Sequence, residues 1–212
     1  MYENEWGNWS HEPTAIKHQV HYGFELTRLE ELVEVTAAAL HRSVDQVLID
    51  DVAAHEREAE SVLTMRHDGK LIGFMLLTFP LMDTVYIAGT MIIPSFQGCG
   101  LKRMATAGLM YEVPGMRFFA GRTQSSIVWA SVAGSASQVL PNPDGGRVDQ
   151  ELIDTRAALV QVLNMDGVIH KGFYGGPLYG EKPMHRDGNV QAWWDTFCDF
   201  ERGDAVLYVA RM

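Results

Sequence analysis

Runs of alternating or continuous apolar residues predict the strands of this chain. Between positions 20 and 26, apolar residues alternate with polar or small ones, as in a half-buried strand. The dipeptide Asp68-Gly69 lies between two apolar runs and is typical of a hairpin turn. Pro80 and Asp83 are expected to end the second of these two runs. The predicted strands span residues 20–26, 61–66, 71–79, 84–93, 117–122, 168–174 and 205–210.

Apolar residues three and four positions apart predict the helices. Thr27 with Glu30, and Ser43 with Gln46, have the spacing of capping boxes, which predict the starts of two helices. The predicted helices span residues 27–40, 43–55, 101–113, 125–133 and 148–163, and a short helix is expected within residues 189–200. Residues 1–17 show no clear period and are expected to form an irregular arm.

The order of these elements predicts the fold class. A strand and two helices precede antiparallel strands, and a helix, a strand and a further helix follow before two late strands. This order is that of a mixed α/β (α+β) protein whose central sheet is largely antiparallel and flanked by helices. The 212 residues suit one compact domain, so we expect a single domain over residues 18–212, after the arm.

Composition favours a soluble protein of a reducing compartment. The first residues are polar and acidic, unlike a signal peptide, and no apolar stretch approaches the ~20 residues needed to span a bilayer. Cys99 and Cys198 do not make a disulfide framework in a chain of 212 residues. We therefore expect a cytoplasmic protein with no membrane partner.

The net charge of −10 argues against a partner that is bound through its phosphate backbone, such as a nucleic acid. An acidic surface would attract a cationic partner such as an amine, although acidity also serves solubility alone. The charge is uneven, because residues 94–122 are basic. The charged residues of this segment are Lys102, Arg103, Arg117 and Arg122, against Glu112 alone. A basic segment in an acidic chain suggests an anionic ligand there.

Residues 91–103 combine the end of a strand, a glycine-containing turn and the start of a helix. The turn consists of Gln97, Gly98, Cys99 and Gly100. The N–H groups at a helix start form an anion site together with the helix dipole, and glycines let the backbone approach a phosphate closely. Leu101 would begin the helix, and Lys102 and Arg103 would add full charges. The arrangement suits a pyrophosphate, although a glycine turn before a helix also occurs without a ligand.

This segment resembles motif A of the GNAT superfamily of N-acyltransferases, in which Gln or Arg is followed by x-x-Gly-x-Gly/Ala after a strand and a proline. Gln97, Gly100 and the preceding Ile92-Ile93-Pro94 match the motif. Lys102 departs from it, because the family prefers Gly or Ala at that position.

The order of elements from about residue 20 to residue 133 also matches the family. The two late strands would complete the family's fold, with elaborations near residues 134–165 and 175–204. The resemblance implies a GNAT-like acyl-CoA N-acyltransferase domain. Its co-substrate would be acetyl-CoA or another acyl-CoA, and no metal would take part.

The resemblance also implies which residues bind the cofactor. In the family, the backbone of the strand before the loop pairs with the pantetheine arm, and Gly89 suits the bulge that opens this strand. A polar residue after the next strand commonly touches the cofactor, and serines stand there in this chain, where they equally suit a helix cap alone. The implied contacts are Met91, Ile92, Ile93, Gln97, Gly98, Cys99, Gly100, Leu101, Lys102, Arg103, Ser125 and Ser126.

Transfer to an amine requires loss of a proton from nitrogen, and the departing thiolate gains one. Tyr86 stands where many family members carry a Glu base, and residues 127–133 lack the Tyr that often serves as acid. Residues 168–180 offer Tyr174 or His170 as substitutes, although a tyrosine there equally suits packing. We take Tyr174 and Tyr86 as the catalytic candidates.

These inferences predict transfer of an acyl group, most simply acetyl, to a primary amine of a small molecule or peptide by direct attack in a ternary complex. The missing Glu and Tyr leave a non-catalytic acyl-CoA-binding or regulatory module as an alternative. A nucleic-acid-modifying relative is a third alternative, against which the net charge argues. The acceptor, the acyl chain length and the oligomeric state stay open, and a homodimer is compatible with the sequence.

Overall fold

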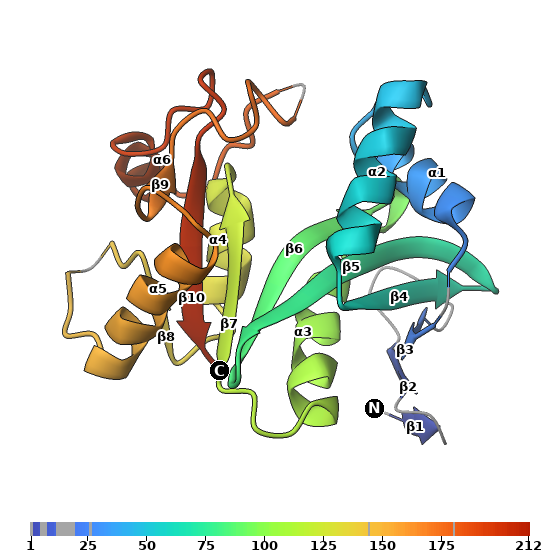
Figure 1. The fold of residues 1–212 in the computed structure, drawn as a ribbon, viewed down its shortest axis with the longest axis horizontal. Coiled ribbons are helices and arrows are strands. Elements are labelled where there is room, and N and C mark those ends of the chain that lie inside the picture. The colour runs from blue at the N-terminus through green and yellow to red at the C-terminus, as the bar shows by residue number, and fades with distance from the viewer. Residues whose placement is uncertain (1, 5–7, 12–19, 26, 144, 180) are drawn as a thin grey trace. The chain divides into compact units, whose positions relative to one another are not determined.

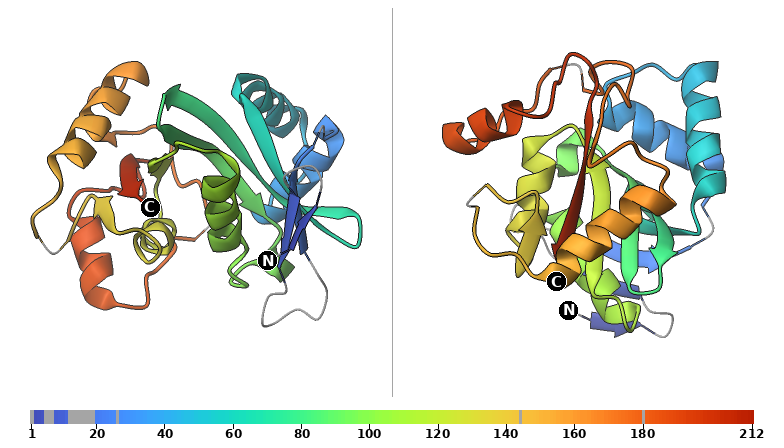
Figure 2. Two further views of the ribbon diagram at one scale, coloured as in Figure 1. Left: turned by 90° about the horizontal axis from the view of Figure 1, so that it is seen from below. Right: turned by 60° about the vertical axis from the view of Figure 1, so that its left-hand side comes forward.

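The computed structural model describes residues 2–4, 8–11, 20–25, 27–143, 145–179 and 181–212. The chain divides into two compact units (Figures 1 and 2). The first unit comprises Met1–Thr78 and Ile87–Gly115, and the second comprises Phe79–Tyr86 and Met116–Met212. Two of the three unit boundaries fall within long strands, Lys70–Leu81 and Thr84–Ile92, and the third follows Gly115.

The helices of the described residues are α1 (Leu29–Ala39), α2 (Gln46–Glu58), the 3-10 turn η1 (Pro94–Phe96), α3 (Leu101–Glu112), α4 (Ser126–Ala133), α5 (Gln150–Val162) and α6 (Gly188–Asp195). The strands are β1 (Tyr2–Asn4), β2 (Asn8–His11), β3 (Val20–Phe24), β4 (Ser61–His67), β5 (Lys70–Leu81), β6 (Thr84–Ile92), β7 (Phe118–Thr123), β8 (Gln138–Leu140), β9 (Ile169–His170) and β10 (Ala205–Arg211).

In the first unit, β1 to β5 pair with their neighbours in antiparallel order. Helices α1 and α2 lie on one side of β4 and β5, and α3 lies on the other (Figure 1). Leu32 and Leu48 of the two early helices pack against Phe74 of β5 in one apolar cluster. The amphipathic spacing that predicts these helices therefore also identifies the face that they bury.

In the second unit, β10 is the central strand and pairs antiparallel with β7, β8 and β9. Leu152 and Leu159 of α5 pack against Phe118 of β7 and Leu207 of β10. Helix α4 lies on the opposite side of β7 and β10 (Figures 1 and 2). Both faces of this sheet are thus covered, which explains why β10 is apolar along nearly its whole length.

Both predicted capping boxes are wrong. Helix α1 follows Arg28 without a side-chain cap, and Thr27 Oγ1 instead donates to the carbonyl oxygen of Glu25 at 3.4 Å. Helix α2 is capped by Asp45, whose carboxylate accepts a hydrogen bond from Leu48 N at 2.8 Å. An acceptor adjacent to the first helical residue is closer to the unpaired N–H groups than the serine two positions earlier.

Three further differences concern strands. The late strand predicted to end at Tyr174 contains only Ile169–His170, because Gly172 adopts φ 66° and turns the chain. The arm predicted to be irregular includes the short strands β1 and β2, which pair with each other, and β2 also pairs with β3. Strand β5 continues through Pro80, and β8 does not appear in the sequence pattern. Leu26, predicted to end the first strand, lies outside the described residues.

The architecture confirms the predicted fold class, a mixed α/β protein with a largely antiparallel sheet flanked by helices. Among the described residues, each helix is too short or too polar to cross a lipid bilayer.

Candidate functional site

The loop from β6 to α3 has the backbone that its glycines predict. After β6, η1 forms one turn in which Phe96 N and Gln97 N donate to the carbonyl oxygens of Ile93 and Pro94. Gly98 and Gly100 then adopt φ 74° and φ 79°. This left-handed region is accessible to glycine at little cost, so the two glycines determine the path of the loop.

Helix α3 starts without a side-chain cap. Its N-cap residue is Gly100, whose carbonyl oxygen accepts from Met104 N at 3.1 Å. The first-turn N–H groups of Leu101 and Arg103 have no acceptor within the helix, as at every helix start. Arg103 is exposed, and its Nη2 lies 4.0 Å from the position that a Cβ of residue 100 would occupy. A helix start, two glycines and a guanidinium therefore meet at one point and suit a phosphate group.

Lys102 occupies the position where the resembling motif has a small residue. Its side chain is half-buried, and burial lowers the pKa of its ammonium group to about 8. Cys99 Sγ donates a hydrogen bond to the carbonyl oxygen of Gln97 at 3.6 Å. Both side chains thus interact closely with the protein around the loop, whereas Arg103 extends to the surface.

The end of β6 presents only part of its backbone. Ile93 N donates to Ile72 O of β5 at 2.9 Å, and the Met91 carbonyl oxygen lies only 2.8 Å from where a Cβ of Gly73 would stand. Successive residues of a strand direct their N–H and C=O groups to opposite sides, so the backbone N–H and C=O of Ile92 point away from β5. Of the three residues expected to pair with a ligand, the geometry therefore favours Ile92.

Gln97 has a role that its position in the motif did not reveal. Its Nε2 donates to the carbonyl oxygen of Ile92 at 2.8 Å. The side chain thereby ties the loop back to the last residue of β6 and fixes the start of the turn. This contact makes Gln97 a positioning residue for the loop.

In the second unit, Tyr86 and Arg122 form a polar pair beside an apolar cluster. Tyr86 of β6 is 3% exposed and packs with Phe118 and Leu207. Arg122 of β7 is half-buried, and its Nε donates to Tyr86 Oη at 2.7 Å. The guanidinium carbon also lies 3.9 Å from the centroid of the Phe173 ring. Arg122 is thus held by a hydrogen bond and by a cation–π contact.

Tyr174 lies next to this pair. Its ring packs edge-on against Phe173, with centroids 4.9 Å apart. Burial raises the pKa of Tyr174, and the phenols of Tyr179 and Tyr86 raise it further, whereas Arg122 lowers it. Burial likewise raises the pKa of Tyr86, against the effect of Arg122. Both phenols are therefore protonated at neutral pH and can donate a hydrogen bond.

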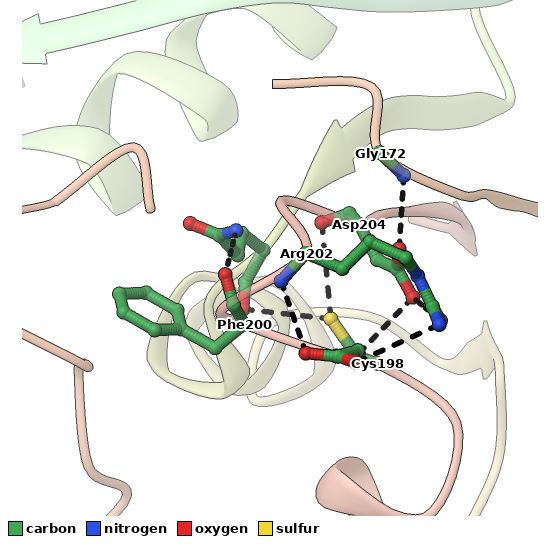
Figure 3. A network of polar contacts seen from close by, with 7 residues as sticks. Gly172, Cys198, Phe200, Arg202 and Asp204 are labelled. Atoms are coloured by element: carbon green, nitrogen blue, oxygen red, sulfur yellow. Dashed lines mark hydrogen bonds and ion pairs between the residues drawn. The ribbon is translucent and has the colours of Figure 1, made fainter. Parts of the chain in front are cut away.

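Asp204 anchors the segment that carries Phe173 and Tyr174 (Figure 3). Its carboxylate is fully buried and accepts from Gly172 N at 2.9 Å and from Asp199 N at 3.1 Å. Arg202 adds two hydrogen bonds, at 2.7 and 2.6 Å. These donors, above all Arg202, lower the pKa of Asp204 to about 2. The carboxylate is charged throughout the physiological range and fixes the turn at Gly172.

A close backbone approach holds the same segment from the other side. Tyr174 N donates to Gly203 O at 2.9 Å, and a Cβ at Gly203 would clash with the backbone of Gly176. The buried side chain of Gln124 donates to Phe200 O at 2.9 Å and accepts from Leu178 N at 2.9 Å. Residues 172–178 therefore have a fixed path despite their lack of regular structure.

Two serines expected near the cofactor serve the protein itself. Ser125 Oγ caps α4 by accepting from Val128 N at 3.4 Å. Ser126 Oγ donates to Gln191 Oε1 at 2.8 Å and is 1% exposed. Ser125 thus caps α4, and Ser126 is committed to a buried contact.

The structure thus places the predicted site residues in two groups. The loop residues and the end of β6 lie together in the first unit, whereas Tyr86, Tyr174 and the two serines belong to the second. The sequence missed the roles of Arg122, Gln124 and Asp204. Arg122 counted only as one charge of a basic segment, and the partners of Gln124 and Asp204 are non-local or lie in irregular turns.

Comparison with known proteins gives a likeness in fold. No protein-family model matches the chain, and no curated protein matches its sequence. A GNAT family acetyltransferase from Elizabethkingia anophelis, solved with acetyl-CoA bound, is similar with a TM-score of 0.50 and 13% identity, over 91% of this chain and 97% of that one. The ribosomal-protein-S18-alanine N-acetyltransferase from Escherichia coli has a TM-score of 0.49 and 14% identity, over 91% and 93% of the two chains.

The likeness to the Elizabethkingia protein shows that this chain has the fold of the GNAT acetyltransferases. At 13% identity, the comparison establishes the fold alone.

Proposed function

We propose that this protein binds an acyl-CoA, most simply acetyl-CoA, at the loop between β6 and α3, and transfers the acyl group to a primary amine of a small molecule or peptide. The observation that carries the proposal is the uncapped start of α3, reached through the left-handed Gly98 and Gly100 and flanked by Arg103. Such a start binds phosphates in unrelated folds, and a pyrophosphate is the anionic centre of coenzyme A. The structurally similar Elizabethkingia acetyltransferase, which has acetyl-CoA bound, supports the same assignment.

The residues of the first unit fit such a ligand. The N–H groups at the start of α3 would hold the pyrophosphate, and Arg103 would add charge. The outward-facing N–H of Ile92, whose carbonyl oxygen already accepts from Gln97 Nε2, would pair with the pantetheine arm, as an added strand pairs with an exposed edge. Gln97 would keep the loop and the strand end in register through its 2.8 Å hydrogen bond. Ser125 and Ser126 are not needed for this assignment.

Acetyl-CoA supplies an activated thioester. In the transfer, the amine nitrogen forms a bond to the acyl carbon, the carbon–sulfur bond breaks, the nitrogen loses a proton and the sulfur gains one. We assign protonation of the departing sulfur to Tyr174, whose phenol stays protonated because burial raises its pKa. Tyr86, which accepts a hydrogen bond from Arg122, would order the acceptor or a water molecule.

The test is incubation of the protein with acetyl-CoA and a panel of polyamines, aminoglycosides, amino acids and short peptides, with thiol release as the readout. Turnover with an amine, and mass spectrometry of an acetylated product, would support the proposal. Tight binding of CoA by calorimetry without turnover on any amine would instead favour a non-catalytic acyl-CoA-binding module. The absence of a carboxylate at position 86, where a tyrosine is buried instead, is the observation that favours this second candidate.

A further inference from the structure

Arg122 is a cation held in place without a counter-ion from the described residues. Two other arginines with partly buried side chains pair with carboxylates: Arg66 with Glu25 and Glu31, and Arg211 with Asp149 and Glu151. Arg156 is also half-buried but pairs with no carboxylate of the described residues, and burial lowers its pKa. Arg122 forms no ion pair with any acidic side chain that the structure describes. Without an anionic partner, the desolvation of a half-buried guanidinium charge is not compensated.

The side chain is nevertheless well fixed. Its Nε is engaged by Tyr86 Oη at 2.7 Å, and the guanidinium carbon lies 3.9 Å from the centroid of the Phe173 ring. Two contacts of different kinds thus hold the guanidinium group. Phe173 itself is held by the turn that Asp204 fixes through Gly172 N at 2.9 Å. Arg122 is therefore oriented before any ligand arrives.

The remaining donors of Arg122 define what it can bind. Because Nε is used, the two terminal nitrogens, Nη1 and Nη2, remain as a planar pair, for which the described chain provides no acceptor. Two parallel N–H groups at this spacing match the two oxygens of a carboxylate and give the strongest form of this ion pair. A guanidinium that is stacked on an aromatic ring can still direct its two terminal nitrogens toward a carboxylate.

We infer that Arg122 recognises a carboxylate of the acceptor, so that the acceptor class is an amino carboxylate, with the amine and the carboxylate in one molecule. This inference rests on the proposed function, which supplies the amine. The phosphates of the donor are assigned to the loop of the first unit, whereas Arg122 lies among Tyr86 and Tyr174, the groups assigned to the amine and the thiolate. Because an amino carboxylate carries both charges, it is also compatible with an acidic protein.

The experiment compares matched acceptors in the thiol-release assay. Each amino acid is paired with the amine that lacks its carboxylate: ornithine with putrescine, lysine with cadaverine, phenylalanine with phenethylamine. We expect kcat/KM of the native protein to be at least about 10-fold higher for the amino acid of at least one pair. Arg122→Gln should abolish this preference, mainly through KM, and leave the affinity for acetyl-CoA unchanged. The exposed Arg147 provides the control, because Arg147→Gln should keep the preference.

Three results would overturn the inference. They are equal kcat/KM for both members of every pair in the native protein, an equal loss for both members in Arg122→Gln, and a loss of acetyl-CoA affinity in Arg122→Gln by calorimetry. Equal kcat/KM within every pair, together with turnover on the plain amines, would contradict only the carboxylate inference and would leave the proposed acetyl transfer standing.

If no amine is acetylated, the same amino acids are titrated by calorimetry into protein saturated with CoA. Binding that is lost in Arg122→Gln and kept in Arg147→Gln supports the carboxylate site, even though transfer has failed. Absence of binding by every amino acid overturns it. Thermal unfolding of each variant shows that the comparison is made on folded protein.

Discussion

Replacement of Gly100 by aspartate tests whether the loop is the phosphate site. A Cβ at this position would meet only Arg103 Nη2, at 4.0 Å, so the side chain fits without a clash. The φ of 79° makes any L-residue strained, by about 1–2 kcal/mol for most and by less for Asn and Asp. The variant should therefore fold, with a modest loss of stability.

The effect on ligand binding follows from charge. A carboxylate about 5 Å from a phosphate, at an effective dielectric constant between about 20 and 80, adds a repulsion of about 1–3 kcal/mol. The carboxylate would also pair with the nearby Arg103 and remove its charge from the site. Together these effects predict a loss of about 2–4 kcal/mol, or a Kd about 30- to 1,000-fold higher.

The assay is calorimetric titration of CoA into the native protein and three variants. Gly100→Asn has the size and backbone tolerance of Gly100→Asp but no charge, so the difference between the two isolates electrostatics. Gly115→Asp introduces the same charge at another left-handed glycine, with φ 88° and nothing within 4 Å of its Cβ, and should bind CoA like the native protein. Equal CoA affinity of the folded Gly100→Asp and Gly100→Asn variants would show that the loop does not bind the phosphates.

Three further predictions concern the contact between β5 and β6, the general acid and the buried carboxylate. Gly73→Ala should lower the free energy of unfolding by about 1–3 kcal/mol in urea titrations, because its Cβ would lie 2.8 Å from Met91 O. Gly89→Ala is the control and should change the free energy of unfolding little, because the nearest contact of its Cβ is at 3.7 Å. Equal effects of the two substitutions would contradict the close approach of β5 and β6. Tyr174→Phe should lower kcat by ~10²-fold with little change in acetyl-CoA affinity, and full activity would exclude it as the general acid. Asp204→Asn should reduce the free energy of unfolding at pH 7 by about 1–3 kcal/mol. Because folding lowers the pKa of Asp204 from 3.8 to about 2, its contribution to the free energy of unfolding is present above pH 3.8 and is lost as the pH falls through 2. The stabilities of the native protein and the variant should therefore converge in acid. A constant difference in stability down to pH 2 would contradict this.

The sequence predicted best those features that depend on neighbouring residues. Gly98 and Gly100 adopt the left-handed conformations that a tight turn requires, and the helix begins directly after them. The hairpin turn at Asp68-Gly69 is found for the same reason, since both residues have positive φ. Local backbone preference is sufficient to specify such features.

The features that the sequence did not predict depend on residues far apart in the chain. Arg122 meets Tyr86 across 36 positions, and Gly172 meets Asp204 across 32. Neither pair leaves a periodic or spacing signal. The apolar pattern of residues 168–174 predicts a strand, but the turn at Gly172 and its bond to Asp204 determine the backbone instead. Tertiary contacts thus override local preference where the second group of site residues is formed.

The most direct test of the central claim is thermal unfolding of the native protein with and without acetyl-CoA. A ligand that binds only the folded state, at 100 times its Kd, adds ~2.7 kcal/mol to the free energy of unfolding. For a chain of 212 residues this corresponds to a rise in Tm of about 5–10 °C. We expect such a rise in the native protein and its loss in Gly100→Asp. A native melting curve that millimolar acetyl-CoA leaves unchanged would contradict it.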